Sequence, residues 1–210
     1  MDADALTAAP THRRRARRGE GDRLREEILD AAERLLIERG SEDAVSVRAI
    51  ADAVGVTPPS IYLHFADKEE LFVAVCDARF EELDRRSEEA AAGATDPMDE
   101  VRRRGEAYIR FGLDNPEQYR ILFLNPQPDT KSADQVEKWA CLQHMVEAVA
   151  RAMDTGMIAS ADPFFVTLEL WAAAHGLTSL LITKPNVPWP PIDDLVNGLL
   201  DMCGLGLYPR

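Results

Sequence analysis

The chain has 210 residues, of which 46% are hydrophobic and 29% charged, and its formal net charge is −13 at pH 7. This composition excludes a largely disordered chain and supplies enough apolar residues for one large domain or two small ones. Nothing in the sequence resembles a signal peptide, and we expect no run of about 18 apolar residues that would span a membrane, which predicts a cytoplasmic protein.

The acidic charge lies mainly in the second part of the chain. Residues 1–68 carry 11 Lys and Arg against 13 Asp and Glu, a net charge of −2, whereas residues 69–210 carry 13 against 24, a net charge of −11. An acidic body repels phosphates wherever a small basic face is not docked. The distribution therefore fits a protein that binds DNA at one site through its N-terminal part.

Residues 1–21 mix Asp, Ala, Pro and Gly with a basic run at residues 12–18, and they show no helical periodicity. We predict a flexible basic arm. Such an arm could grip phosphates or enter a minor groove beside a binding site. A solvated charge run without a partner is the alternative.

Residues 22–66 are predicted to form three helices. Apolar residues recur at three- and four-residue spacing across residues 22–39, and a glycine ends this first helix. Residues 41–45 form a connecting loop. The second helix starts at Ser46, a good N-cap, and ends at Gly55, which can adopt a positive φ and allow a tight turn.

The third helix is predicted to begin with Thr57 as its N-cap and Pro58 in its first position, where the missing N–H costs nothing. Val56, Ile61 and Phe65 are predicted to point inward. The outward side chains of this helix suit a DNA groove, and two basic residues outside it can add phosphate contacts. The candidate DNA-binding residues are Arg48, Thr57, Pro58, Pro59, Ser60, Tyr62, His64 and Lys68.

A long helix is predicted over residues 67–92, opening with a capping box formed by Asp67 and Glu70. Its first turn can offer N–H groups to a phosphate, and Lys68 adds positive charge there. About 25 helical residues span roughly 40 Å. Movement at the far end of this helix can therefore shift the element at its near end.

Residues 50–71 carry the pattern Ile50-Ala51-x-x-x-Gly55-Val56-Thr57-x-x-x-Ile61-Tyr62-x-His64-Phe65-x-x-Lys68-x-x-Leu71. This pattern and the helix before it closely resemble the N-terminal domain of the TetR (tetracycline-repressor) family of bacterial transcription regulators, over about residues 22–75. Family members often have Gly where this chain has Pro59.

The resemblance implies an all-α fold with three parts. After the flexible basic arm (residues 1–21) comes a three-helix helix-turn-helix DNA-binding domain (residues 22–66). The long helix then joins it to a C-terminal helical domain for ligand binding and dimerisation (residues 67–210).

Beyond the long helix, Gly, Pro and Asn residues punctuate the chain and predict five further helices. They cover residues 97–115, a short stretch from residue 116, residues 132–154, residues 163–184 and residues 192–203. The last two carry more apolar surface than one small domain needs, and two such helices from each of two chains can pack as a four-helix bundle. We therefore predict a homodimer, which requires a palindromic double-stranded DNA operator.

The C-terminal part also holds large, partly polar side chains that can line a ligand pocket. They are Tyr108, Phe111, Tyr119, Phe123, Trp139, Met145, Trp171 and His175. The stretch Trp171-x-x-x-His175-Gly176 looks like a signature of one group of TetR-type C-terminal domains. The resemblance implies a pocket for a lipophilic or aromatic small-molecule effector, in which Arg110 or Arg120 could receive an anionic group.

Packing in the core or at an interface is the alternative role for each of these aromatic residues. For His175, a hydrogen-bonded structural histidine competes with a ligand contact.

The leading hypothesis is a repressor that leaves its operator when a small hydrophobic ligand binds, with no cofactor and no metal. Three cysteines, Cys76, Cys141 and Cys203, form no CxxC pair and predict neither a zinc site nor a disulfide framework. Three alternatives stay open: a response to a protein partner, a response to cysteine oxidation, or an activator. The sequence contains none of the motifs HExxH, GxSxG, GxxxxGK[ST] or GxGxxG, so an enzyme is not predicted.

Overall fold

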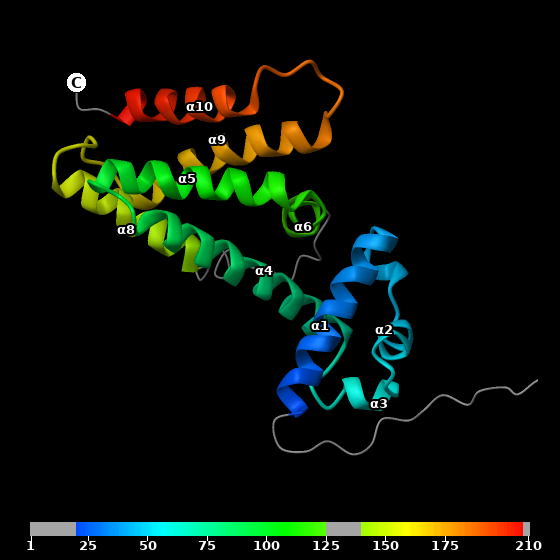
Figure 1. Cartoon of the computed structure of the whole chain (residues 1–210). Helices are drawn as coiled ribbons and strands as arrows, with labels where there is room; N and C mark the ends of the chain where they lie inside the picture. The colour runs from blue at the N-terminus through cyan, green and yellow to red at the C-terminus, as the bar shows by residue number, and fades with distance from the viewer. Residues whose placement is uncertain (1–19, 125–139, 208–210) are drawn as a thin grey trace, which may run out of the picture. The chain divides into compact units, whose positions relative to one another are not determined.

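The computed structural model describes residues 20–124 and 140–207, which form helices and their connections without any strand (Figure 1). The predicted all-α fold is confirmed. The chain divides into two compact units, residues 1–77 and 78–210, and the division falls inside the long helix α4 (Lys68–Ala91). The first turns of α4 therefore belong with the N-terminal unit and the rest with the C-terminal unit.

The N-terminal unit is built from α1 (Glu20–Arg39), α2 (Val47–Val54), α3 (Pro58–Ile61) and the start of α4. One 3-10 turn, η1 (Glu42–Ala44), lies in the connection that the sequence predicts as a plain loop. The core takes side chains from all four helices. Those at most 2% exposed include Ile28, Leu36, Ile50, Ile61, Phe65 and Leu71.

The turn between α2 and α3 has the predicted form. The Ser46 hydroxyl accepts the Ala49 N–H at 3.1 Å and caps α2. Gly55 has φ of 77°, and the N–H groups of Gly55 and Val56 donate to the carbonyls one turn back, at 3.3 and 2.9 Å. This Schellman-type ending satisfies the last carbonyls of α2 and turns the chain sharply into α3.

The start of α4 also follows the prediction. The Asp67 carboxylate accepts the Glu70 N–H at 2.8 Å, and the Glu70 carboxylate in turn accepts the Ala66 N–H. The reciprocal bond reaches one residue further back than in the usual capping box. Two free N–H groups near the start of α4 are thereby used inside the protein.

Within the described residues, the C-terminal unit contains the rest of α4, five further α-helices and a π-helical turn that directly follows one of them. The α-helices are α5 (Pro97–Asp114), α6 (Pro116–Tyr119), α8 (Ala140–Asp154), α9 (Pro163–Thr183) and α10 (Ile192–Leu207), and the π turn is η2 (Arg120–Leu124). The predicted helix at residues 132–154 is seen from residue 140 only, because its start lies outside the described residues. The last helix runs four residues beyond its predicted end.

Helix α5 is the centre of this unit, because α8, α9 and α10 all pack against it (Figure 1). Asp96 caps it by accepting the N–H groups of Met98 and Asp99, both at 2.9 Å. Near its other end Gly112 permits a close approach. A Cβ atom there would lie 2.4 Å from the Thr178 methyl carbon of α9 and 2.8 Å from the Tyr119 ring.

Helix α9 is apolar on nearly every side, and within the described residues it has the length and composition of a membrane span. Our expectation that no stretch would reach this level was wrong, because the run stays apolar on average despite Glu169 and His175. One face of this helix packs inside the unit. The buried Thr178 hydroxyl donates to the Ala174 carbonyl at 2.8 Å, and the helix packs against α5 and α8. Only 28% of the apolar stretch is buried, however, and side chains such as Phe165 and Leu180 are exposed.

Candidate functional sites

Helix α3 and the residues just after it present an exposed surface on the N-terminal unit. Ile61 and Phe65 anchor this segment in the core and are 1% and 2% exposed. Pro59 is exposed, while Tyr62 and Leu63 expose 51% and 84% of their surface. Two large side chains left in solvent beside a rigid turn are suited to contact a partner.

Leu63 was not among the predicted contacts, although helical periodicity could have found it. It lies two residues from both Ile61 and Phe65, which places it on the opposite side of the helix. The predicted contacts from this segment are polar, aromatic or proline side chains and do not include this aliphatic one. If this segment enters a major groove, an exposed leucine can contact the thymine methyl group there.

Thr57 occupies the N-cap position of α3, but its side chain does not cap the helix. Its hydroxyl lies 3.1 Å from the Ser60 hydroxyl instead. The reason is that Pro58 and Pro59 supply no N–H, and the Ser60 N–H already donates to the Thr57 carbonyl at 2.8 Å. The hydroxyls of Thr57 and Ser60 therefore form a hydrogen bond with each other at the start of α3.

The remaining predicted DNA contacts lie around this surface within the same unit. Arg48 is exposed in the first turn of α2. Lys68 and His64 are half-buried, and the Lys68 ammonium lies 5.7 Å from the centre of the Phe72 ring. This contact holds a positive charge at the start of α4.

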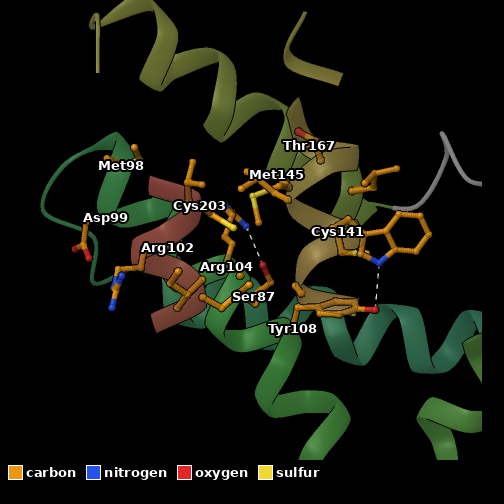
Figure 2. Close-up of a pocket in the computed structure, with 18 of the residues that line it drawn as sticks. Ser87, Met98, Asp99, Arg102, Arg104, Tyr108, Cys141, Met145, Thr167 and Cys203 are labelled. Atoms are coloured by element: carbon orange, nitrogen blue, oxygen red, sulfur yellow. Dashed lines mark hydrogen bonds between the residues drawn. The ribbon is translucent and has the colours of Figure 1, made fainter. Parts of the chain in front are cut away.

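The C-terminal unit contains a cavity of about 720 Å³, formed by α4, α5, the π turn, α8, α9 and α10 (Figure 2). Four of the eight predicted ligand contacts line it: Tyr108, Phe123, Met145 and Trp171. The rest of the wall was not predicted from the sequence to contact a ligand. It includes Leu83, Met98, Cys141, Met157, Leu170 and Cys203. These residues come together only through the packing of helices that are distant in sequence.

The other four predicted contacts lie elsewhere. Phe111 is buried with its ring 5.6 Å from the Arg86 guanidinium, outside the cavity wall. Tyr119 and His175 stand behind the wall, next to Tyr108. Trp139 lies outside the described residues.

Tyr108, Tyr119, His175 and Trp171 form one hydrogen-bonded network. The Trp171 indole N–H donates to the Tyr108 hydroxyl at 3.1 Å. That hydroxyl lies 3.1 Å from the Tyr119 hydroxyl and 3.2 Å from His175 Nδ1, and the Tyr119 hydroxyl lies 2.7 Å from the same nitrogen. The polar groups of these four side chains therefore find partners among themselves.

Burial keeps this network uncharged. It raises the pKa of Tyr108 far above its usual value and that of Tyr119 to about 12, and it lowers the pKa of His175. The Tyr119 hydroxyl and Nδ1 of the neutral imidazole share a short hydrogen bond, in which the tautomer of His175 determines the donor. The arrangement favours a structural role for His175, while Tyr108 and Trp171 turn part of their surface to the cavity.

The two arginines in the described cavity wall are already paired. Arg104 is 5% exposed, and its guanidinium donates to Glu88 at 2.8 Å, Glu100 at 2.9 Å and Ser87 at 3.2 Å. Burial disfavours the charged guanidinium, but the two carboxylates outweigh it and raise the pKa of Arg104. Arg102 donates to Asp201 of α10 at 2.7 Å.

Arg110 and Arg120, proposed from the sequence to receive an anionic group, do not line this cavity. Arg110 is drawn to Asp193 of α10, at 2.6 Å. Arg120 pairs with Glu117 and donates to the Ile182 carbonyl at 3.1 Å. Both guanidiniums instead tie together the helices around the cavity.

The sequence matches two family descriptions and a characterised relative. Residues 28–75 match the family described as "Bacterial regulatory proteins, tetR family", and residues 101–203 match "Tetracyclin repressor-like, C-terminal domain". The HTH-type transcriptional repressor AcnR of Corynebacterium efficiens is 32% identical over 169 residues, which is 76% of this chain and 82% of AcnR. The chain belongs to the TetR family of DNA-binding transcription regulators.

Two further proteins resemble this TetR-family chain. The HTH-type transcriptional activator FasR of Mycolicibacterium smegmatis is 30% identical over 147 residues, which is 69% of this chain and 66% of FasR. A crystal structure of the regulator FadR from Bacillus subtilis, in complex with stearoyl-CoA, has a TM-score of 0.74 at 16% identity. The match covers 87% of this chain and 99% of FadR. This last likeness shows a shared fold.

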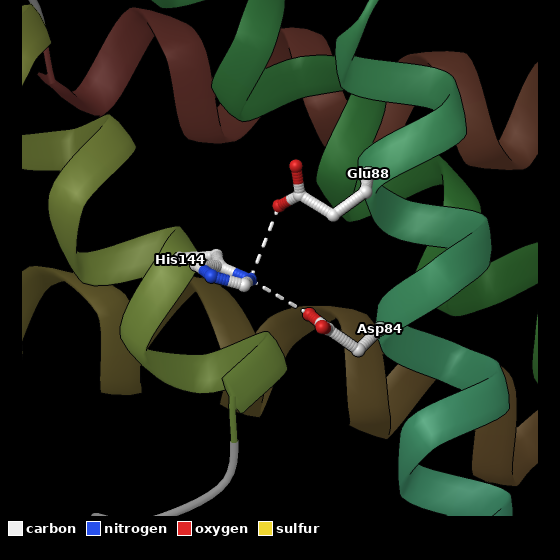
Figure 3. Close-up of side chains that lie close together, drawn as sticks. All are labelled: Asp84, Glu88 and His144. Atoms are coloured by element: carbon white, nitrogen blue, oxygen red, sulfur yellow. Dashed lines mark hydrogen bonds and ion pairs between the residues drawn. The ribbon is translucent and has the colours of Figure 1, made fainter.

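In this TetR-family chain, one group outside the cavity wall joins α4 to α8 (Figure 3). His144 Nδ1 lies 2.8 Å from Asp84 Oδ1 and 3.1 Å from Glu88 Oε1. Two carboxylates and an imidazole can hold a metal ion, but the same Glu88 oxygen also accepts from Arg104 at 2.8 Å. A hydrogen bond between His144 and Asp84 and an ion pair between Arg104 and Glu88 account for this cluster, which connects α4 to α8.

Two of the three cysteines line the cavity. Cys76 is buried in the N-terminal unit, whereas Cys141 and Cys203 lie in the cavity wall, and none of the three forms a disulfide among the described residues. Burial raises the pKa of Cys141 to about 12 and also raises that of Cys203. Because the thiolate is the reactive form, these positions do not favour an oxidation sensor.

Proposed function

We propose that this TetR-family regulator is a repressor that binds a palindromic operator as a homodimer and is released when a lipophilic small molecule enters the cavity. The observation that carries the proposal is the place of α4. Phe80, Leu83 and Ser87 of this helix line the cavity, while Leu71 of the same helix is buried in the N-terminal core. A ligand that fits better after α4 has shifted lowers DNA affinity by its differential affinity for the two states.

The DNA contacts divide into two kinds. Pro59, Tyr62 and Leu63 are the exposed side chains of the α3 segment, and we assign them to the groove. Arg48 and Lys68 carry positive charge near it, and we assign them to phosphates. Thr57, Pro58, Ser60 and His64 complete the predicted set at the edge of this surface.

The dimer is proposed to form through α9 and α10. Large apolar side chains remain exposed on them in the single chain: Phe165 (65%), Leu180 (49%), Ile192 (43%) and Met202 (61%). A Cβ atom added at Gly176 or Gly198 would have no other atom of the described chain within 4 Å, which leaves room for another helix to approach. Regulators of this family bind operator DNA as dimers, and paired reading helices roughly 34 Å apart require a palindromic site.

The cavity supports a lipophilic effector. Its volume of about 720 Å³ is within the range of small-molecule sites, and apolar and aromatic side chains form most of its wall. FadR, with the same fold, holds stearoyl-CoA, which has a long apolar tail. We propose a cytoplasmic regulator without catalytic activity or cofactor.

The sign of regulation depends on where the operator lies relative to a promoter. AcnR is named a repressor and FasR an activator, so activation is the second candidate.

Selection of bound DNA from random duplexes tests the DNA part of the proposal. We expect a palindrome whose half-sites are about one helical turn apart or somewhat more, bound by two chains in sedimentation analysis. Recovery of an asymmetric site bound by a single chain would refute the dimeric mode. Lac-type reporter assays with the recovered site upstream of or overlapping a promoter then separate repression from activation.

A further inference from the structure

The cavity is elongated along α5 and differs at its two ends. Its wall includes Met98 and Tyr108 of this helix, which are ten residues and therefore about 15 Å apart. Figure 2 shows Asp99 and Arg102 on the opposite side of the pocket from Tyr108 and Cys141. Tyr108 belongs to an aromatic end, whereas Asp99 and Arg102 belong to a charged end.

The aromatic end offers a ligand little besides apolar contact. Phe123 and Trp171 lie there within 6.3 Å of each other, ring centre to ring centre, and Phe123 lies 5.9 Å from Tyr108. The Tyr108 hydroxyl is occupied by Trp171, Tyr119 and His175. An apolar tail fits this end, because the Tyr108 hydroxyl and the Trp171 indole N–H, which belong to its wall, already have hydrogen-bond partners.

The charged end offers no vacant cation to an anionic group. The described wall contains three aspartates, Asp96, Asp99 and Asp201, and two arginines, Arg102 and Arg104. Arg102 pairs with Asp201, and Arg104 with the carboxylates of Glu88 and Glu100. An anion that took Arg102 would compete with Asp201, and one that took Arg104 would compete with Glu88 and Glu100, in a part of the chain that is already acidic.

We propose that this cavity takes an uncharged or cationic amphiphile and discriminates against anionic ones. The apolar tail lies at the Tyr108 end. The head group lies at the opposite end, where Asp99 pairs with Arg103 at 2.9 Å, Asp201 pairs with Arg102 at 2.7 Å, and the exposed Asp96 accepts only backbone N–H groups among the described residues. This inference rests on the proposed ligand site and adds the charge class of the ligand. It separates this chain from a fold relative whose ligand, stearoyl-CoA, carries several phosphates.

The test compares three ligands with the same twelve-carbon tail and different heads: 1-dodecanol, dodecyltrimethylammonium and dodecanoate. Each displaces the neutral fluorescent probe N-phenyl-1-naphthylamine from the full-length protein at pH 7.5, below its micelle concentration. We expect dodecanoate to bind about tenfold more weakly than the other two, the effect of roughly one unfavourable charge contact. The gap should narrow in 0.5 M NaCl, because salt screens the exposed carboxylates.

The outcomes separate the two proposals. Dodecanoate binding as tightly as the other ligands, or more tightly, overturns the charge selection and leaves the ligand site intact. Failure of all three ligands and of the probe to bind overturns the ligand site itself.

A matched pair of variants locates the effect. Asp201→Asn removes the partner of Arg102 at the cavity, whereas Asp193→Asn removes the partner of Arg110 outside it; both break an ion pair between α10 and α5. We expect Asp201→Asn to raise dodecanoate affinity several-fold and Asp193→Asn to leave it unchanged. Equal effects of the two variants would refute selection at the cavity, since they would reflect net charge alone. Thermal melts of both variants confirm the fold.

Discussion

The two units use their sequences in opposite ways. In the N-terminal unit the proposed DNA contacts Tyr62 and Leu63 are exposed, and the buried side chains of Ile61 and Phe65 anchor their segment in the core. In the C-terminal unit the proposed ligand-binding surface is the wall of an internal cavity. The polar groups of Tyr108 and Arg104 in this wall already form hydrogen bonds or ion pairs with other residues of the chain. The proposed DNA-binding surface therefore consists of the exposed side chains of one short segment, whereas the cavity is the space that remains between several packed helices.

The largest expected effect tests the division between anchors and contacts in α3. Ile61→Ala should lower the free energy of unfolding by about 2–5 kcal/mol, because a fully buried side chain is truncated. Leu63→Ala should change it by less than about 0.5 kcal/mol, because this side chain is 84% exposed. Urea unfolding measures both. Operator binding by anisotropy should nevertheless weaken in Leu63→Ala, and normal DNA affinity in that variant would contradict the assignment.

The next effect concerns the cavity thiols. The pKa of Cys141, raised by burial to about 12, leaves very little thiolate at pH 8. Iodoacetamide should therefore alkylate it at least about 100-fold more slowly in the native protein than in urea. Peptide mass spectrometry over time provides the measurement. Rapid native alkylation at Cys141 would restore cysteine oxidation as a rival signal.

A smaller effect tests the packing that frames the cavity. Gly112→Ala should destabilise the chain by about 1–3 kcal/mol, because the new Cβ would meet the Thr178 methyl carbon at 2.4 Å. Thr178→Ser removes that methyl group and should recover part of the loss in the double variant, leaving the contact with Tyr119. Thermal unfolding of the wild type, the two single variants and the double variant gives the coupling free energy between residues 112 and 178. Strict additivity would show that α5 and α9 do not meet there.

The smallest effect is a pH dependence at His175. Burial lowers its pKa in the folded state, so below about pH 6.5 the unfolded chain binds the proton more readily. This contribution to stability is present above that pH and is lost as the pH falls. His175→Gln should show a shallower loss of stability from pH 7 to pH 5 in parallel urea titrations. Identical slopes in the two proteins would contradict a neutral, buried imidazole.

The sequence predicted the N-terminal unit well because its signals are local. Ser46, Gly55, Pro58 and Asp67 each fix a helix end through their own backbone chemistry, so boundaries follow from single residues. Thr57 is the exception. Its hydroxyl was predicted to cap α3 but instead forms a hydrogen bond with the Ser60 hydroxyl, three residues away. Leu63 could have been found from periodicity, but an exposed leucine carries no local mark of function.

The cavity was only partly predictable because it arises from tertiary packing. Tyr108 and Trp171 were identified by their size and polarity, and both line it. Phe111 shares these features but faces Arg86, and sequence alone does not tell which side of α5 is hollow. Asp201, the partner of Arg102, lies 99 residues away in the chain, so this ion pair could not be foreseen, whereas the pair of Arg104 with Glu100 on the same helix could have been.

The central claim is that the cavity and the operator are coupled through α4. The most direct measurement is the dissociation constant of the selected operator duplex, by fluorescence anisotropy, with and without saturating 1-dodecanol or dodecyltrimethylammonium. We predict at least about tenfold weaker operator binding with the better ligand, and ligand binding weakened by the same factor when operator is saturating. Unchanged operator affinity, with the cavity shown to be occupied by probe displacement, would contradict the account.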